Sequence, residues 1–318
     1  MGKKKLLVLA GLLACTLSPP LPAAEGEGRW RGPDGERLPF ATDDEILAFL
    51  REAEVVKKKV IPQGINKPLK VRLRKDGVEA NAIFRTVNVR KPRHETAGEV
   101  YLDFHDSYKF ECAAYEVSRF LGIDNVPPCA VRTEGRTEGT MQLWIEDAMT
   151  EQDRRESGTA PPLQIEWMRQ QQTMRLFDAL IYNFDRNQGN MLIDADWKLW
   201  FIDHTRSFHR SAEVPKLDRL VWVERGLWRR LQELDRDVLE NRIGGLVSPT
   251  RLDFVLQRRG RLVEAIGDRI ARMGEEGVLF EPSQGLPEGV EGSADYELAT
   301  STDDIPEESP PVEGGGGP

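Results

Sequence analysis

The chain has 318 residues, of which 39% are hydrophobic and 31% are charged, and its formal net charge at pH 7 is −9. This composition excludes a membrane-embedded bundle and argues against a general nucleic-acid binder, which would normally be basic. The length suits one two-lobed domain or two ordinary domains. Residues 275–318 hold twelve Asp or Glu and no Lys or Arg, which leaves a charge of +3 on residues 1–274. The acidity therefore says little about the partners of the rest of the chain.

Residues 1–24 have the pattern of an export signal. Three lysines at positions 3–5 precede the apolar run 6–13, which is too short to cross a bilayer because a spanning helix needs about 20 residues. Residues 12–15 are similar to a bacterial lipobox, which would make Cys15 the lipidated first residue of the mature chain. The alternative is ordinary cleavage after residue 23 or 24, with loss of Cys15. Both predict an exported protein of the periplasm or cell envelope, and contact with a membrane is expected only through the N-terminal lipid of the first alternative.

Two further segments are predicted to lie outside the fold. Residues 25–41 are rich in Gly, Glu and Arg and are expected to form a tether. Residues 281–318 are rich in Gly, Pro, Glu and Ser and end in four glycines and a proline. Such a segment buries too little apolar area to offset the entropy lost on ordering, so a disordered acidic tail is expected.

Strands and a helix are predicted for residues 42–149, the first half of the folded region. Thr42 and Glu45 form a capping box that begins a helix. Apolar and polar residues alternate on either side of Asp76-Gly77, which predicts a hairpin. The expected strands cover 70–74, 78–84, 100–104, 129–132 and 140–146. This half should therefore be α+β.

Helices dominate the rest of the prediction. One helix is expected to begin at Asp106 or Ser107 and to end at Gly122. Residues 150–280 should form a mostly helical second half. Its expected elements are a helix around 167–181, a helix from 249 past 270, and between them a hairpin of 191–193 against 199–202 that turns at 194–196.

Cys112 and Cys129 remain when the export segment is set aside, and their spacing gives no zinc site. In an oxidising compartment the two could form a disulfide. Cys112 falls inside a helical pattern, and both residues have the surroundings of small core side chains. The sequence favours the core interpretation and leaves the disulfide open.

The predicted hairpin at 191–202 carries polar residues at both ends. Asp185 and Asn190 precede it at a spacing of five, and Asp203 follows it. Phosphoryl transfer needs one carboxylate to orient an acceptor hydroxyl, and an amide oxygen plus a second carboxylate to hold Mg²⁺ against phosphates. Two polar hairpin ends without a function are the simpler alternative. A calcium loop beginning at Asp185 is disfavoured, because Asn190 stands where that loop requires Gly and Asp196 where it requires Glu.

Three stretches of the sequence resemble a known group of proteins. They are SYKFECAAYEVSRFLG at 107–122, GTMQLWIEDA at 139–148 and LFDALIYNFDRNQGNMLIDADWKLWFIDHTRSF at 176–208. The similarity is to the atypical kinases, a group that includes the phosphatidylinositol 3- and 4-kinases, the HipA-type and CotH kinases, and the secretory-pathway kinases that phosphorylate proteins or proteoglycan xylose. It spans about residues 60–210 and implies a two-lobed protein-kinase-like fold, with an N-lobe over 42–149 and a C-lobe over 150–280.

The resemblance also implies roles for individual residues. Asp185 would be the catalytic base, and Asn190 and Asp203 would bind Mg²⁺ or Mn²⁺. Glu111 would fix the cation that binds the phosphates of ATP, and residues 139–148 would form the strand and hinge beside the adenine. Trp144 of that hinge would contact the nucleotide, or would belong to the core.

The sequence departs from the family pattern in the N-lobe. Arg85 stands where a Lys should reach the α- and β-phosphates, and these two side chains are not interchangeable. Lys70 on the partner strand is the candidate to replace that Lys. The loop that should cover the phosphates has only Gly64 before Lys67.

Three further polar residues lie around the predicted site. His204 replaces the Phe that typical kinases have after the metal-binding Asp, and it is expected to be structural rather than a base. Arg186 and Arg206 either contact phosphate or pair with nearby carboxylates, and the sequence does not decide between these roles.

Two functions remain open at this point. The first is an exported or lipid-anchored kinase that transfers the γ-phosphoryl group of ATP to an unidentified protein or glycan hydroxyl. The second is a pseudokinase that serves as a binding or scaffold module of the envelope. The presence of all three polar catalytic residues favours the enzyme over the scaffold. A lipid substrate is less favoured, because no basic amphipathic helix stands out.

Overall fold

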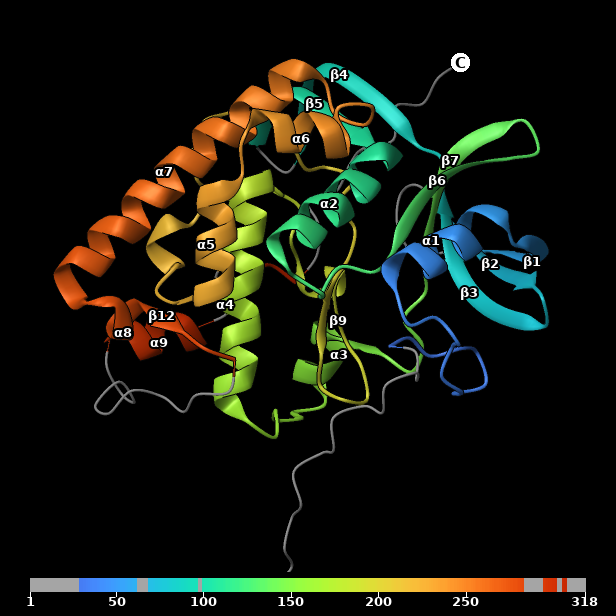
Figure 1. Cartoon of the computed structure of the whole chain (residues 1–318), viewed down its shortest axis with the longest axis horizontal. Helices are drawn as coiled ribbons and strands as arrows, with labels where there is room; N and C mark the ends of the chain where they lie inside the picture. Colours follow the sequence, from blue (N-terminus) through green and yellow to red (C-terminus); the bar gives the residue numbers. More distant parts are fainter. Residues whose placement is uncertain (1–28, 62–67, 97–98, 283–293, 302–304, 308–318) are drawn as a thin grey trace, which may run out of the picture.

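The computed structural model describes residues 29–61, 68–96, 99–282, 294–301 and 305–307 (Figure 1). The export signal, Cys15, Gly64 and Lys67 lie outside these residues. The chain has an N-lobe built on a β-sheet and a mostly helical C-lobe, which confirms the predicted α+β fold class.

The N-lobe sheet has five antiparallel strands in the order β1-β2-β3-β7-β6. Their bounds are β1 (Glu54–Val60), β2 (Leu69–Lys75), β3 (Val78–Arg85), β6 (Cys129–Glu134) and β7 (Thr137–Leu143). The predicted hairpin is β2–β3, in which Lys75 pairs with Val78. Asp76 and Gly77 at its turn both have positive φ, the geometry that suits the twist of a two-residue hairpin. The strand predicted to reach residue 146 ends at Leu143.

A second hairpin joins the sheet to the following helix. It consists of β4 (Asn88–Thr96) and β5 (Glu99–Ser107), which form a separate two-stranded antiparallel sheet. The predicted strand 100–104 is the middle of β5. The sequence did not predict β4, because its run of basic residues with a proline hides the alternation that marks a strand.

Two helices pack on the N-lobe sheet. α1 (Asp43–Glu52) begins with the predicted capping box, in which Thr42 Oγ1 accepts from Glu45 N and Glu45 Oε2 accepts from Thr42 N. α2 (Tyr108–Leu121) has Ser107 as its N-cap and ends at Gly122, whose φ of 72° lies in the left-handed region that favours glycine. α2 buries Phe110, Ala113, Ala114, Val117 and Leu121.

The C-lobe is arranged around α4, with the long helix α7 packed against it (Figure 1). Its helices are α3 (Glu151–Glu156), α4 (Gln164–Ile181), α5 (Arg225–Glu233), α6 (Arg236–Ile243), α7 (Pro249–Met273), α8 (Glu275–Val278) and α9 (Ala294–Thr300). Its strands are β8 (Met149–Thr150), β9 (Met191–Ile193), β10 (Leu199–Phe201), β11 (Val223–Glu224) and β12 (Leu279–Phe280). None of the described helices combines the length and the apolar character that crossing a membrane requires. One apolar core runs through both lobes, from Trp30 to Ile305.

The prediction of a tether is wrong for residues 29–41. Trp30 and Leu38 are buried in the core, and Leu38 N donates to Trp30 O, which closes the segment into a loop. Two apolar side chains in a polar stretch are enough to hold the segment, although its average composition resembles a linker.

The prediction of a disordered tail is also wrong for the described part of residues 281–318. α9 packs against α4, and Arg175 of α4 donates to the carbonyl oxygens of Ala299 and Ser301. Ala299 and Ile305 are buried. The physical reason is the same as for residues 29–41. A few apolar side chains, here Ala299 and Ile305, are buried and hold a segment whose average composition is polar.

Cys112 and Cys129 form a disulfide with a Cα–Cα distance of 4.9 Å, so the preference for two separate core residues is wrong. The bond joins α2 to the first residue of β6. Helical periodicity in the sequence could place Cys112 in the core, but it could not show which strand passes beside it.

The docking of the C-terminal segment predicts a stability effect. Ile305→Ala should lower the free energy of unfolding by about 2–4 kcal/mol, because it removes a buried side chain from the core. Urea denaturation followed by tryptophan fluorescence measures this change.

The matched control is Glu307→Ala, since that side chain is exposed. If Ile305→Ala had the same free energy of unfolding as wild type, the segment would not dock on the C-lobe.

Candidate functional site

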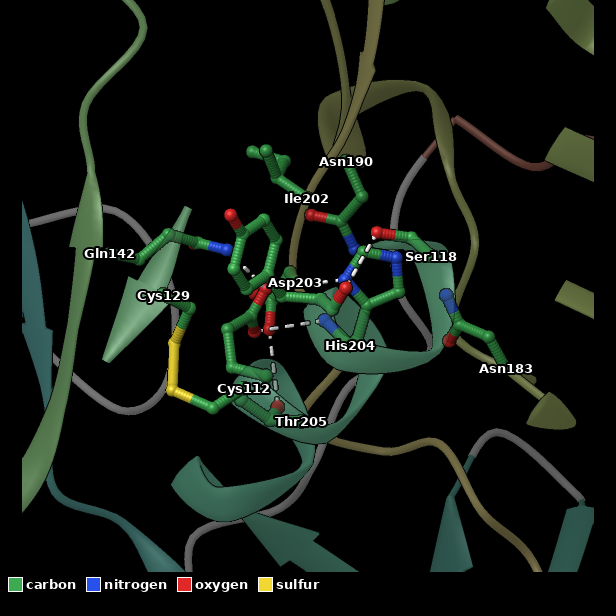
Figure 2. A network of polar contacts seen from close by, with 12 residues as sticks. Cys112, Ser118, Cys129, Gln142, Asn183, Asn190, Ile202, Asp203, His204 and Thr205 are labelled. Atoms are coloured by element: carbon green, nitrogen blue, oxygen red, sulfur yellow. Dashed lines mark hydrogen bonds and ion pairs between the residues drawn. A yellow bond between two sulfur atoms is a disulfide. The ribbon is translucent and has the colours of Figure 1, made fainter. Parts of the chain in front are cut away.

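The hairpin β9–β10 brings the two ends of the predicted site together. Met191 pairs with Phe201, so the residues before and after the hairpin are neighbours. Ile202 N donates to Asn190 O at 3.2 Å, which places Asn190 beside the residue that precedes Asp203. Asn190 Nδ2 donates to Asp185 O at 3.1 Å. The structure therefore gathers all three residues that the spacing singled out, and Figure 2 shows Asn190 next to Ile202 and Asp203.

Local hydrogen bonds fix the loop between Asp185 and Asn190. The side-chain oxygen of Asn187 accepts from Gly189 N at 2.8 Å and from Asn190 N at 3.2 Å, which caps a short 3-10 turn at Gln188–Asn190. Gln188 N donates to Pro306 O at 2.9 Å. The C-terminal segment thus supports the loop directly, a contact that the sequence did not predict.

Glu111 of α2 is a fully buried carboxylate that contacts the turn after β10, which carries Asp203 and His204. It accepts hydrogen bonds from Gln142 Nε2 at 2.9 Å and from the backbone N of His204 at 3.0 Å, and His204 Nδ1 lies 3.2 Å away. Figure 2 shows the Gln142 side chain directed toward the turn that carries Asp203 and His204. Burial alone would raise the pKa of the Glu111 carboxyl, but the charge of Arg85 and the hydrogen bonds from His204 and Gln142 lower it to about 2.

The side chain of Gln142 links Arg85 to Glu111 by hydrogen bonds. Arg85 Nη1 donates to Gln142 Oε1 at 3.0 Å, and the amide of the same Gln142 donates to Glu111. The direct cation–carboxylate pair expected in this lobe is thus replaced by Arg85–Gln142–Glu111. Sequence reasoning missed Gln142, although its place in the stretch 139–148 beside the hinge was a usable signal.

Arg186 belongs to the framework of the site. Its guanidinium donates to both carboxylate oxygens of Asp178 and to the carbonyl oxygen of Ile202, and it lies 3.1 Å from His204 Nε2. His204 is fully buried between Glu111 and Arg186. Of the two open alternatives for Arg186, the structure favours pairing with a carboxylate, and the burial of His204 fits its expected structural role.

Arg206 lies closer to the predicted base. Its Nε donates to Asp106 Oδ2 at 3.2 Å, and its Nη1 lies 3.1 Å from Asp185 Oδ2. Here too the structure favours pairing with carboxylates, and one of them is the predicted catalytic Asp185.

Lys70 faces the hinge. Its Nζ lies 3.7 Å from the centroid of the Trp144 ring and 3.9 Å from Glu146 Oε2. Burial lowers the pKa of Lys70 and raises that of Glu146. Lys70 and Trp144 therefore meet each other, whereas Arg85 contacts Gln142. The expectation that Lys70 replaces the missing Lys stays a prediction.

The oxygen atoms of Asn190 and Asp203 suit a metal ion that is bound together with phosphates. Among the described residues, no three His, Cys, Asp or Glu side chains converge as a preformed metal site. Asn190 and Asp203 offer an amide and a carboxylate oxygen from the two ends of one hairpin. Mg²⁺ in phosphoryl-transfer sites commonly takes only one or two protein ligands and completes its shell with phosphates and water. The residues present therefore fit the group that the resemblance implies.

No protein-family model and no curated protein matches this sequence. Solved structures with a similar fold do exist. The hydra Fam20 protein, solved with sugar, has a TM-score of 0.55 at 15% identity, over 76% of this chain and 93% of that chain. This chain therefore has a fold similar to that of the hydra protein. The Golgi casein kinase with Mn and ADP bound has a TM-score of 0.55 at 13% identity, over 77% of this chain and 80% of that one. A further structure of the Golgi casein kinase has a TM-score of 0.56 at 13% identity, over 76% of this chain and 79% of that chain. These likenesses confirm the predicted two-lobed kinase-like fold.

The buried carboxylate of Glu111 predicts a pH-dependent stability. Because its folded-state pKa lies below the ordinary value of 4.5, Glu111 contributes stability that is present above pH 4.5 and is lost as the pH falls toward 2. Glu111→Gln should therefore lower the free energy of unfolding by about 3 kcal/mol at pH 7. The difference from wild type should shrink between pH 4.5 and 2 in urea titrations.

Glu116→Gln on the same helix is the control, since Glu116 is only partly buried and should show no comparable loss. A Glu111→Gln deficit that is the same at every pH would contradict the assignment of the effect to ionised Glu111.

Proposed function

We propose that this protein is an atypical kinase that transfers the γ-phosphoryl group of ATP to a hydroxyl group of a protein or glycan. The observation that carries the proposal is the meeting of Asp185, Asn190 and the Asp203 turn at one end of β9–β10, with Glu111 of the N-lobe bonded to the same turn. In this proposal Asp185 is the base, Asn190 and Asp203 are the metal ligands, and Arg85 is the cation that pairs with the phosphates.

The residues divide the work of the reaction. Asp185 accepts the proton of the acceptor hydroxyl as the hydroxyl oxygen bonds to the γ-phosphorus, the bond from phosphorus to the β–γ bridging oxygen breaks, and ADP leaves. Asn190 and Asp203 would hold Mg²⁺ or Mn²⁺, which supplies compensation for the negative charge on the phosphates. Gln142, which is itself bonded to Glu111, holds the Arg85 guanidinium, whose permanent charge can pair with the α- and β-phosphates.

The hinge supplies the remaining part of a nucleotide site. Trp144 N donates to Asn81 O at 3.0 Å as the chain leaves β7, and the Trp144 ring is covered by Lys70. In this proposal the adenine contacts the hinge at 144–146. Export from the cytoplasm and lipidation of Cys15 belong to the proposal as well, and they are supported by the signal-like sequence of residues 1–24.

Measurements of nucleotide binding and of phosphate transfer separate the roles of Asp185 and Asp203. Wild type should gain about 5–10 °C in melting temperature with saturating ATP and Mg²⁺ or Mn²⁺, because a ligand at about 100 times its Kd stabilises the native state by about 2.7 kcal/mol. Asp203→Asn should lose the metal-dependent part of that gain. Asp185→Asn should keep the gain but transfer phosphate at least about 100-fold more slowly, measured by autophosphorylation and by phosphorylation of casein and xylosides.

Asp196→Asn is the matched control, because Asp196 lies at the opposite, exposed turn of the same hairpin. Nucleotide binding without any transfer in wild type would indicate a binding module. Absence of both binding and transfer would refute a nucleotide-dependent function.

A further inference from the structure

Arg206 joins two buried carboxylates that come from distant parts of the chain. Asp106 is the penultimate residue of β5, and Asp185 lies in the loop after α4. Both are buried, at 4% and 5% exposure, and Arg206 between them is 5% exposed. Burial alone would lower the pKa of the Arg206 guanidinium, but the charges of Asp185, Asp106 and Asp203 outweigh burial and raise it. The guanidinium is therefore held in a strongly negative environment.

The turn that carries Arg206 is fixed at several points. Thr205 O accepts from Ser107 N at 2.8 Å, and Thr205 Oγ1 donates to Asp203 Oδ1 at 3.1 Å. Phe208 N donates to Ile181 O, and the fully buried Phe208 ring packs against Phe110. Because the backbone on both sides is anchored, the Arg206 side chain has a defined starting point from which it reaches the two carboxylates.

A guanidinium suits this place better than an ammonium group. Its planar fork donates in two fixed directions, so one group can bind Asp106 through Nε and Asp185 through Nη1 at the same time. Removal of the guanidinium would remove a bond from each of these two buried carboxylates. The orientation of Asp185 therefore depends on a residue twenty-one positions further along the chain.

We propose that Arg206 is a positioning residue that sets the rotamer of Asp185, and that Asp106 in turn sets the direction of the Arg206 guanidinium. The inference rests on the proposed kinase function. The bond from Arg206 to Oδ2 of Asp185 restricts the rotation of the carboxylate, and this restriction would keep the carboxylate aligned with an acceptor hydroxyl. Such alignment acts on the chemical step, since a displacement of about 1 Å can cost about 100-fold in rate.

Steady-state kinetics of Arg206→Lys and Asp106→Asn test the proposal. Arg206→Lys should lower kcat at least about 10-fold and leave KM for ATP within about twofold of wild type, and Asp106→Asn should give a smaller loss of the same kind. Arg132→Lys is the control, because Arg132 is a largely buried arginine that binds Leu50 O, Ala53 O and Glu134 away from the site. The rate of Arg206→Ala should recover in part with added methylguanidine.

Two kinetic results for Arg206→Lys would contradict the proposal. Wild-type kcat in Arg206→Lys would overturn it, and so would a change confined to KM for ATP, which would place Arg206 on the nucleotide instead. If wild type transfers no phosphate, the kinase proposal fails, and crystal structures still decide the inference. Asp185 should change rotamer in the Arg206→Met, Asp106→Asn double variant, and an unchanged rotamer would overturn the positioning role.

Discussion

The buried carboxylate of Glu111 is the constraint on which the arrangement of the two lobes depends. A charge that loses its water must be compensated by donors, and removing one partner of such a group costs about 3–5 kcal/mol. The donors of Glu111 come from β7, through Gln142, and from the turn after β10, through His204. Because one donor belongs to the N-lobe sheet and the other to the C-lobe hairpin, satisfying this one carboxylate fixes α2, the sheet and the Asp203 turn relative to one another. The disulfide of the adjacent Cys112 ties the same helix to β6.

Features that depend on nearby residues were predictable from the sequence. The Asp76-Gly77 hairpin, the capping box at Thr42 and the meeting of Asn190 with the Asp203 turn each involve short separations along the chain. A hairpin of known length fixes which residues lie at its ends, so spacing alone was sufficient there. The contacts that complete the site were not predictable in this way. Arg206 meets Asp106 across 100 residues, and Gln142 meets Glu111 across 31. The pattern of a single element does not contain such pairings.

The two ends of the described chain show a different limit of sequence reasoning. Averaged over a window, residues 25–41 and 281–318 have the composition of a linker and a disordered tail. Trp30 and Leu38 at one end, and Ala299 and Ile305 at the other, are nevertheless buried. A segment is held by a few well-placed side chains and by backbone hydrogen bonds, and neither contributes much to an average. Among the described acidic residues of the second segment, Glu297 and Glu307 are exposed, whereas Asp295 pairs with Arg269.

The contact between Gln188 and the C-terminal segment also has a consequence for the order of folding. Gln188 Nε2 donates to Ile305 O, a partner 117 residues later in the chain. A pairing of such separation closes a long loop, and its entropic cost is paid only when the intervening helices have already collapsed. The loop that carries Asp185 and Asn190 can therefore acquire this support only after residue 305 has been synthesised and the intervening helices have folded.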